Sequence, residues 1–272
     1  MTLLWNDRRA RTFLQCAFDR AVAQADPRAA VAPFLPEKPQ GRCVVVGAGK
    51  ASAAMAAAVD AAWPEVELCG LVATRHGHAV PAGRIKVIEA GHPLPDHNSS
   101  RAAREMLAMV RHLKPEDLVL ALMSGGGSSL LCSPRDGLTL QEKAAVHGAL
   151  LRSGASIAEM NIVRSALSDI KAGRLAEAAH PARVVTLLIS DVVGDTAVAI
   201  GSGPTIPVVI PNGAARTIVE RYNLQLPAAA RRLIESPRAG MAPNGPADIR
   251  FVATPFKSLQ AAADLAEVES VT

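Results

Sequence analysis

Aromatic residues are scarce in this chain of 272 residues, since Phe, Tyr and Trp together make up only 3% of it. A core with so few rings must be built from aliphatic side chains, and hydrophobic residues still account for 49% of the sequence. That content is enough for a large α/β core of Ala-rich helices on a Val- and Ile-rich sheet. The length suits one large domain, or one domain with part of another.

Paired cysteines and long apolar runs are also missing. None of the four cysteines belongs to a C-x-x-C motif, which argues against a zinc site or a disulfide framework and favours buried free thiols in a reducing compartment. No apolar run is long enough to cross a bilayer, and the N-terminus is charged too early for a secretory signal. We therefore expect a cytoplasmic protein that does not contact a membrane.

Basic clusters are absent as well. The formal net charge is +4, and no run of Lys or Arg exceeds two residues. Nucleic-acid binding requires a concentrated basic face, so we expect no nucleic-acid partner. The weak positive balance is compatible with small anionic ligands.

Strand-like and helix-like segments alternate along the sequence. Buried strands are predicted over 43–46, 66–73, 85–89, 117–123, 184–189 and 249–253. Helices are predicted over 10–25, 51–63, 100–113, 213–222, 228–235 and 258–268, and in much of 140–180. This alternation favours an α/β fold with a doubly wound, mostly parallel, Rossmann-like sheet and helices on both faces.

The domain organisation is predicted from the same pattern. We assign 1–40 to an N-terminal helical segment packed on the main domain, 41–245 to the Rossmann-like domain, and 246–272 to the start of a truncated C-terminal part. The Pro-, Gly- and Asn-rich stretch 236–247 marks the boundary. The last helix has no returning strand after it, so we expect the C-terminal domain to be missing.

The first candidate site follows the strand at 43–46 and reads Gly47-Ala48-Gly49-Lys50-Ala51-Ser52. Glycines between a strand and a helix let backbone N–H groups approach an anion at the helix N-terminus, and Lys50 adds a mobile positive charge. The run is one glycine short of the dinucleotide motif G-x-G-x-x-G, and no acidic residue follows at Thr74-Arg75, where that motif needs one. A tight turn with a solvated lysine is the alternative.

The second candidate site is Ser124-Gly125-Gly126-Gly127-Ser128-Ser129, directly after a buried strand. Consecutive glycines cost chain entropy, which is understandable if the backbone must wrap around an anion while the serines add hydroxyl donors. A flexible turn is the alternative. The spacing does not match the G-x-S-x-G motif of serine hydrolases.

The third candidate site is Ser190-Asp191-Val192-Val193-Gly194-Asp195, followed by Gly201-Ser202-Gly203-Pro204-Thr205. Asp191 at a strand end can accept a proton or bind Mg²⁺, and Asp195 is a second candidate metal ligand. Cap and turn roles are the alternatives for both. Ser202 and Gly203 add further donors. Anion-binding loops, a lysine and a carboxylate are the components of phosphoryl transfer, which depends on positioning and charge neutralisation.

Taken in order, these motifs resemble the glycerate 2-kinase family, whose members combine an N-terminal glycerate-kinase domain with a C-terminal MOFRL domain and also carry the name of tartrate-utilisation hydroxypyruvate reductase. The similarity continues in His92-Pro93-Leu94-Pro95-Asp96, in Asn161-Ile162-Val163-Arg164 and in the segment 167–176, and it extends from about residue 10 to the end of the chain.

The resemblance implies transfer of the γ-phosphate of ATP to the 2-hydroxyl of D-glycerate with Mg²⁺. It makes Lys50 the catalytic lysine and Asp191 the base or metal-linked carboxylate. It assigns phosphate or the glycerate carboxylate to the second candidate site, residues 124–129, which we call the glycine loop. Lys171 and Arg174 become anion partners, with a solvated helix face as the alternative. The implied partner is D-glycerate, and a homodimer is the candidate assembly.

The sequence departs from the family pattern at several positions. Ser165-Ala166 replaces the usual Lys-His, Val208 stands where Asp is common, and Ala172 replaces the usual Gly. The family's active site lies between its two domains, so a chain without the second domain is expected to lose turnover. The alternatives are an NAD(P)H-dependent hydroxypyruvate reductase and a non-catalytic nucleotide-binding module.

Overall fold

A parallel sheet of six strands forms the centre of the molecule. The computed structural model describes residues 6–236 and 247–268. The strands are β1 (Cys43–Ala48), β2 (Leu68–Arg75), β3 (Ile85–Ala90), β4 (Leu118–Ser124), β5 (Arg183–Ile189) and β6 (Asp248–Ala253). They lie in the order β3-β2-β1-β4-β5-β6, and every pair is parallel. The predicted doubly wound α/β fold is confirmed.

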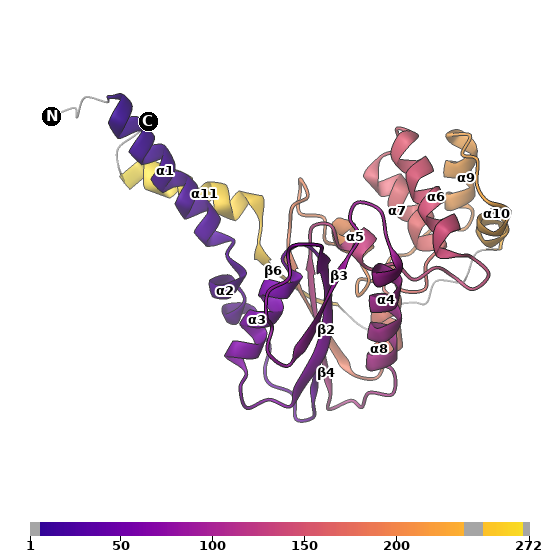
Figure 1. Cartoon of the computed structure of the whole chain (residues 1–272), viewed down its shortest axis with the longest axis horizontal. Helices are drawn as coiled ribbons and strands as arrows, with labels where there is room; N and C mark the ends of the chain where they lie inside the picture. The colour runs from indigo at the N-terminus through magenta and orange to yellow at the C-terminus, as the bar shows by residue number, and fades with distance from the viewer. Residues whose placement is uncertain (1–5, 237–246, 269–272) are drawn as a thin grey trace.

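Helices surround this sheet (Figure 1). They are α1 (Asp7–Gln24), α2 (Pro27–Ala30), α3 (Ser52–Ala62), α4 (His97–Val110), α5 (Gly127–Leu130), α6 (Leu140–Arg152), α7 (Ile157–Ala166), α8 (Arg174–Ala179), α9 (Ala214–Arg221), α10 (Ala228–Glu235) and α11 (Pro255–Val268), with 3₁₀ turns η1 (Ala32–Phe34) and η2 (Ala197–Ser202). Among the described helices, none combines the length and the apolar character needed to cross a membrane.

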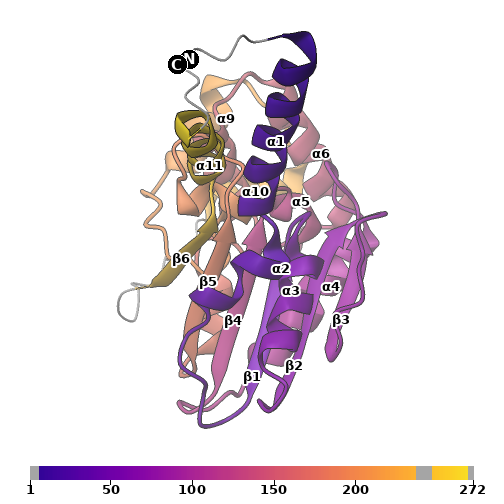
Figure 2. The ribbon, with the colours of Figure 1, turned by 90° about the vertical axis from the view of Figure 1, so that its left-hand side faces the viewer.

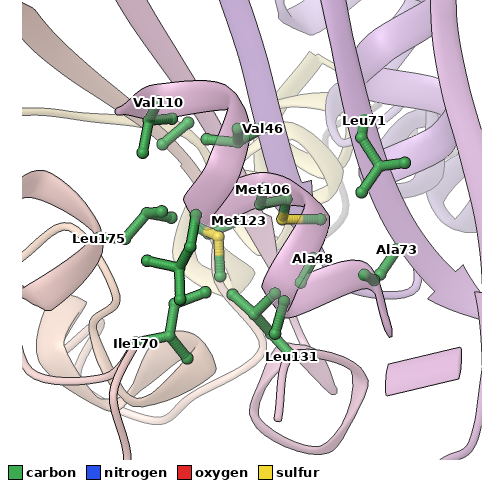
Figure 3. Packing of buried hydrophobic residues seen from close by; sticks show 14 of the residues in the cluster. Val46, Ala48, Leu71, Ala73, Met106, Val110, Met123, Leu131, Ile170 and Leu175 are labelled. Atoms are coloured by element: carbon green, nitrogen blue, oxygen red, sulfur yellow. The ribbon is translucent and has the colours of Figure 1, made fainter. Parts of the chain in front are cut away.

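Both faces of the sheet are covered, because its central strands are apolar on both sides. Every residue of β1 and β4 is buried, as expected for a parallel sheet between helix layers. On one face, Val46 and Met123 pack against Met106 of α4 and Leu175 of α8 (Figure 3). On the other face, the strands pack against α3 and the 3₁₀ turn η1. Aliphatic side chains supply most of this core, as the scarcity of aromatic residues predicts.

Local capping signals decide where several helices begin. Asp96 caps α4 through the N–H of Ser99, so the helix starts at His97, earlier than the predicted residue 100. A carboxylate or hydroxyl at this position satisfies an N–H that the first turn leaves unpaired. Pro255 begins α11, three residues before the predicted start, because proline fits the first helical position without loss of a hydrogen bond.

Helices α6, α7, α9 and α10 form a separate layer with its own apolar cluster, which includes Leu150, Val163, Ile218 and Ile234. Figure 1 places this layer beyond α4 and α5, away from the strands. The periodicity predicts the helices but not their grouping, because amphipathic spacing does not specify which partner covers the apolar face.

The two ends of the described chain lie together. Helices α1 and α11 run side by side and project away from the sheet (Figures 1 and 2). Strand β6, which opens the segment predicted as the start of a C-terminal part, is hydrogen-bonded to β5 as the last strand of the sheet. The predicted boundary at 245/246 falls outside the described residues and stays a prediction.

We predict that Leu120→Ala lowers the free energy of unfolding by about 2–5 kcal/mol. Leu120 is 0% exposed in the central strand β4, so truncation leaves a cavity that the rigid sheet cannot fill. Leu151→Ala, at a side chain that is 51% exposed, is the matched control and should change stability little. Urea unfolding measures both, and equal midpoints for the two variants would contradict this account of the core.

Candidate functional site

The loops after β1 and β4 are bonded to each other. The backbone N–H of Lys50 donates to the carbonyl of Gly125 at 2.9 Å, and the N–H of Ala51 donates to the side-chain oxygen of Ser124 at 3.0 Å. Strands β1 and β4 are neighbours at the point where the strand order reverses, the place at which ligands bind in open parallel sheets. The first and second candidate loops therefore form one structural unit.

The remaining hydrogen bonds of the first loop also stay within the protein. The N–H of Gly49 donates to Ala73 at 3.1 Å, and the N–H of Ser52 donates to Gly49 at 3.2 Å. The buried hydroxyl of Ser52 donates to the Ala73 carbonyl at 2.7 Å. With the N–H groups of Lys50 and Ala51 engaged as well, this loop offers a ligand mainly the exposed side chain of Lys50.

Gly47 lies inside strand β1 and not in the loop. It is buried between Val72 of β2 and Leu122 of β4, and a Cβ at this position would overlap the carbonyl oxygen of Leu122. The close approach of the strands accounts for this glycine, and no contact with a ligand is needed to explain it.

The glycine loop is different, because its backbone is open. Among the described residues, the N–H groups of Gly125, Gly126 and Gly127 meet no hydrogen-bond acceptor. Gly126 has a φ of 84°, a left-handed conformation that lets successive N–H groups converge into an anion-binding nest. The hydroxyl of Ser129 is turned back to the carbonyl of Gly126 at 3.3 Å. The nest is thus made by backbone donors.

Three titratable side chains converge on this loop. The carboxylate of Asp191 lies against Gly125, where a Cβ would overlap it. A Cβ at Gly126 would lie 3.0 Å from the His92 ring and 3.5 Å from the Cε of Lys50. The absence of side chains at these glycines therefore makes room for a lysine, a histidine and a carboxylate around the free N–H groups.

His92 is a residue that motif reasoning did not select as a candidate. Burial lowers its pKa, and the nearby cations Lys50 and Arg75 lower it further, while Asp191 acts in the opposite direction. An imidazole held neutral beside a lysine and a carboxylate can accept a proton. The available signal was its position in the loop after the strand predicted at 85–89, since such loops lie at the carboxyl edge of the sheet.

A hydrogen-bond chain connects the third candidate loop to the second. The Nζ of Lys171 donates to the carbonyl of Ser128 at 2.7 Å and to its hydroxyl oxygen at 3.0 Å. The Ser128 hydroxyl lies 2.9 Å from that of Ser202, which donates to Oδ1 of Asn161 at 3.0 Å. The carbonyl of Gly203 accepts from the backbone N–H of Gly173. The structure thus brings together all three predicted loops.

The side chains of Lys171 and Arg174 turn inward. Lys171 is 2% exposed, which excludes a solvated helix face for it, and burial lowers its pKa to about 7, with the nearby Lys143 and Arg164 acting in the same direction. Arg174 is partly buried and donates to the backbone carbonyls of Ser165 and Lys171 at 2.8 and 3.1 Å.

The turn that directs Lys171 inward is strained. Ala172 has a φ of 55°, in the left-handed region that costs a non-glycine residue about 1–2 kcal/mol. Its N–H donates to the carbonyl of Ser202 at 3.1 Å, which holds the turn against the third candidate loop. The resemblance noted above has glycine at this position.

Asp195, the second predicted metal ligand, lies in a left-handed turn with a φ of 47°. Its Oδ1 is buried and has no hydrogen-bond partner among the described residues. Within the described residues, no hydrogen bond or ion pair joins its side chain to Lys50 or to the glycine loop. Asp191 is therefore the carboxylate that belongs to the convergence of charges at Gly125 and Gly126.

The described residues contain no group of three or more His, Cys, Asp or Glu side chains that could hold a metal by themselves. Mg²⁺ does not require such a group, because in phosphate-transferring sites it is held by one or two carboxylates together with substrate phosphates. A single carboxylate beside an open anion-binding loop fits that pattern.

Comparison with a family model identifies residues 13–235 as a match to DUF4147, described as a domain of unknown function. A protein of Agrobacterium vitis, provisionally named hydroxypyruvate reductase, is 57% identical over 96% of this chain and 60% of its own length. The D-glycerate 2-kinase of Thermotoga maritima is 39% identical over 80% of this chain and 53% of its own length. The matched part of the chain thus spans about 40% to 60% of the length of these curated relatives.

Two solved structures also match this chain over almost its whole length. The glycerate kinase of Thermotoga maritima superposes with a TM-score of 0.87 at 34% identity, over 96% of this chain and 63% of that one. A Pyrococcus horikoshii protein superposes with a TM-score of 0.85 at 32% identity, over 98% of this chain and 65% of that one. The resemblance carried by the sequence motifs is confirmed.

We predict that Ala172→Gly raises the free energy of unfolding by about 0.5–1 kcal/mol, because it relieves left-handed strain at some cost in chain entropy. Gly173→Ala is the opposite control. Gly173 has a φ of 85°, and a Cβ there would lie 2.7 Å from the Cα of Pro207, so this change should destabilise the fold by more than 1 kcal/mol. Urea midpoints measure both, and a lower midpoint for Ala172→Gly would contradict the strain.

Proposed function

The chain belongs to the DUF4147 family, and from that membership we propose that it forms the phosphate- and acceptor-binding part of a glycerate 2-kinase. The reaction is transfer of the γ-phosphate of ATP to the 2-hydroxyl of D-glycerate. The observation that supports it best is the convergence of Lys50 and Asp191 on the open N–H groups of Gly125 and Gly126. Relatives that share this fold carry glycerate kinase names.

The glycine loop holds phosphate in this proposal. Its unpaired N–H groups bind phosphate oxygens without a side chain between backbone and ligand, which suits a close approach. Phosphoryl transfer needs this kind of prearranged donor set, because most of its catalysis is positioning and charge stabilisation. The first loop supports the arrangement through the bond from the Lys50 N–H to the Gly125 carbonyl.

Lys50 is the catalytic cation of the proposal. Its side chain is exposed, its Cε lies near Gly126, and its ammonium makes no ion pair with a carboxylate in the described part of the chain. An unneutralised ammonium beside a phosphate site stabilises the negative charge that develops on the transferred group.

Asp191 is the general base of the proposal. Its carboxylate lies at Gly125, where it can orient the acceptor hydroxyl and accept its proton, and His92 beside Gly126 is a second group able to accept one. When bound with ATP, Mg²⁺ supplies charge neutralisation between phosphate oxygens, and Asp191 is the residue we assign to hold it.

Hydroxypyruvate reduction is the second candidate, favoured by the name of the Agrobacterium vitis relative. A Rossmann dinucleotide site needs free N–H groups at the first strand–helix turn and an acidic residue at the end of the second strand. Here the N–H groups of Gly49, Lys50 and Ala51 are engaged within the protein, and β2 ends in Thr74-Arg75. These features favour the kinase.

The cytoplasmic location and the homodimer expected from the sequence stay predictions.

We predict that Lys50→Ala reduces glycerate-dependent ADP release by roughly 10²–10³-fold, as removal of one stabilising donor does in other enzymes. Lys114→Ala is the matched control, because that exposed lysine precedes β4 at the opposite edge of the sheet. The assay couples ADP formation to NADH oxidation with D-glycerate, ATP and Mg²⁺. ATP binding is measured in parallel. If Lys50→Ala weakens ATP binding, the result supports the site even when the chain shows no turnover.

Two outcomes would count against the kinase. A folded wild-type chain that neither turns over nor binds ATP would remove the nucleotide site from the glycine loop. Oxidation of NADH or NADPH with hydroxypyruvate, in the absence of ATP, would move the protein to the reductase.

A further inference from the structure

A cavity lies between the glycine loop and the layer formed by α6 and α7. Its volume is about 20 Å³, which is room for a group little larger than one water molecule. Its lining includes Ser128, Cys132, Lys143, His147, Arg164 and Lys171. Ser128 and Lys171 belong to the hydrogen-bond chain that joins the candidate loops.

Three of these lining residues are buried cations. Lys171, Lys143 and Arg164 are 2%, 6% and 7% exposed, whereas Lys and Arg are almost never so buried unless they are paired. No Asp or Glu belongs to the described lining. Asp169 is close enough to act on Lys143, but it does not line the cavity. Several positive charges thus face one small space without a carboxylate in it.

The two ammonium groups are oriented but not neutralised. Lys143 donates to the carbonyls of Arg164 and Leu167 at 3.1 and 2.6 Å, and Lys171 donates to the Ser128 carbonyl at 2.7 Å. Carbonyl dipoles compensate a buried ammonium only in part. Burial accordingly lowers the pKa of Lys143 to about 8 and that of Lys171 to about 7.

The guanidinium of Arg164 has an unused hydrogen-bond donor. Its Nε is buried and has no hydrogen-bond partner among the described residues. Its other guanidinium nitrogens make long contacts, at 3.4 Å to Asn161, at 3.5 Å to His147 and at 3.7 Å to the sulfur of Met160. Burial holds the pKa of His147 near 3, so this histidine is neutral and adds no charge. A guanidinium with an unused donor is suited to a carboxylate or phosphate oxygen.

The cavity adjoins the phosphate site. Ser128 lines it and directly follows the open glycines. His92, which packs against Gly126, lies close enough to His147 to influence its pKa. A small acid whose carboxylate lies in the cavity would therefore have the rest of its carbon skeleton directed to the glycine loop.

We propose that this cavity binds the carboxylate of a small hydroxy acid, with Arg164 and Lys143 as its principal partners and Lys171 linking it to the glycine loop. The inference rests on the proposed function for the identity of the acid, since it makes the cavity the acceptor subsite of the kinase. Arg164 and Lys143 are then specificity residues, because they select an acid over the corresponding alcohol.

Isothermal titration of D-glycerate and of glycerol into the wild-type chain tests the requirement for a carboxylate. Glycerol keeps the hydroxyl groups and lacks the acid. We expect D-glycerate to bind at least tenfold more tightly than glycerol, as a charge-assisted hydrogen bond does over a neutral one. Equal binding of the two compounds, or no binding of D-glycerate, would overturn the proposal.

Arg164→Met tests the assigned partner. Loss of the guanidinium should weaken D-glycerate binding about 10- to 100-fold, with partial rescue in Arg164→Lys, while ATP binding stays at the wild-type value. Arg152→Met is the matched control, because Arg152 is exposed at the end of neighbouring helix α6 and its loss should change neither affinity. Wild-type affinity in a folded Arg164→Met protein would contradict the assignment.

The pH dependence needs no variant. The groups facing Lys171 are Lys143, Arg164 and Cys132, and those facing Lys143 also include Arg174 and Asp169. An anion favours the protonated lysines, so D-glycerate affinity should fall as pH rises through about 7 and 8, by up to roughly tenfold per unit for each proton taken up. Constant affinity between pH 6 and 9 would contradict the cationic subsite.

These measurements separate the two proposals. Glycerate binding that depends on Arg164, in a chain that neither releases ADP nor binds ATP, keeps the acid subsite and rejects the nucleotide site at the glycine loop. ADP release that is lost in Lys50→Ala but unaffected in Arg164→Met keeps the kinase and rejects the subsite.

Discussion

The hydrogen bond from the Lys50 N–H to the Gly125 carbonyl, reinforced by that from Ala51 to Ser124, is the interaction on which the rest of the site depends. It joins two loops that leave neighbouring parallel strands where the strand order reverses. Because it consumes the donors of the first loop, that loop contributes a side chain while the glycine loop keeps its N–H groups open. The two loops have different roles because a backbone N–H that already donates within the protein is not available to a ligand.

Charge is distributed around this junction in two different ways. At Gly125 and Gly126, a lysine, a histidine and a carboxylate lie together, so the net charge there is balanced and proton exchange is feasible. On the other side of Ser128, the helices α6 and α7 bring cations together without an acid in the cavity. The first arrangement suits chemistry on a phosphate, and the second suits holding an anion in place.

Most secondary structure was predictable, because the strands are continuous apolar runs and the helices have clear periodicity. The differences lie at the ends of elements and in short helices that were not predicted, such as α5, which begins at Gly127 inside the expected loop. Helix α4 begins at His97 because Asp96 caps it, and β1 continues to Ala48 because Gly47, without a side chain, lets β4 pair closely beside it. The loop motifs identified the region of the site, yet Ser52 serves the backbone, and His92 became a candidate only when its loop was located beside Gly126.

Local chemistry determined the fold class, the three strand-end loops and the family, because apolar period, glycine position and motif order are all properties of neighbouring residues. Tertiary structure alone decided which donors remain open, that Lys171 is buried, and that Arg164 and Lys143 meet it across a cavity. These properties depend on contacts between segments far apart in the chain. A lysine in a helix pattern has the same sequence signature whether it faces water or an apolar layer, and only packing distinguishes the two.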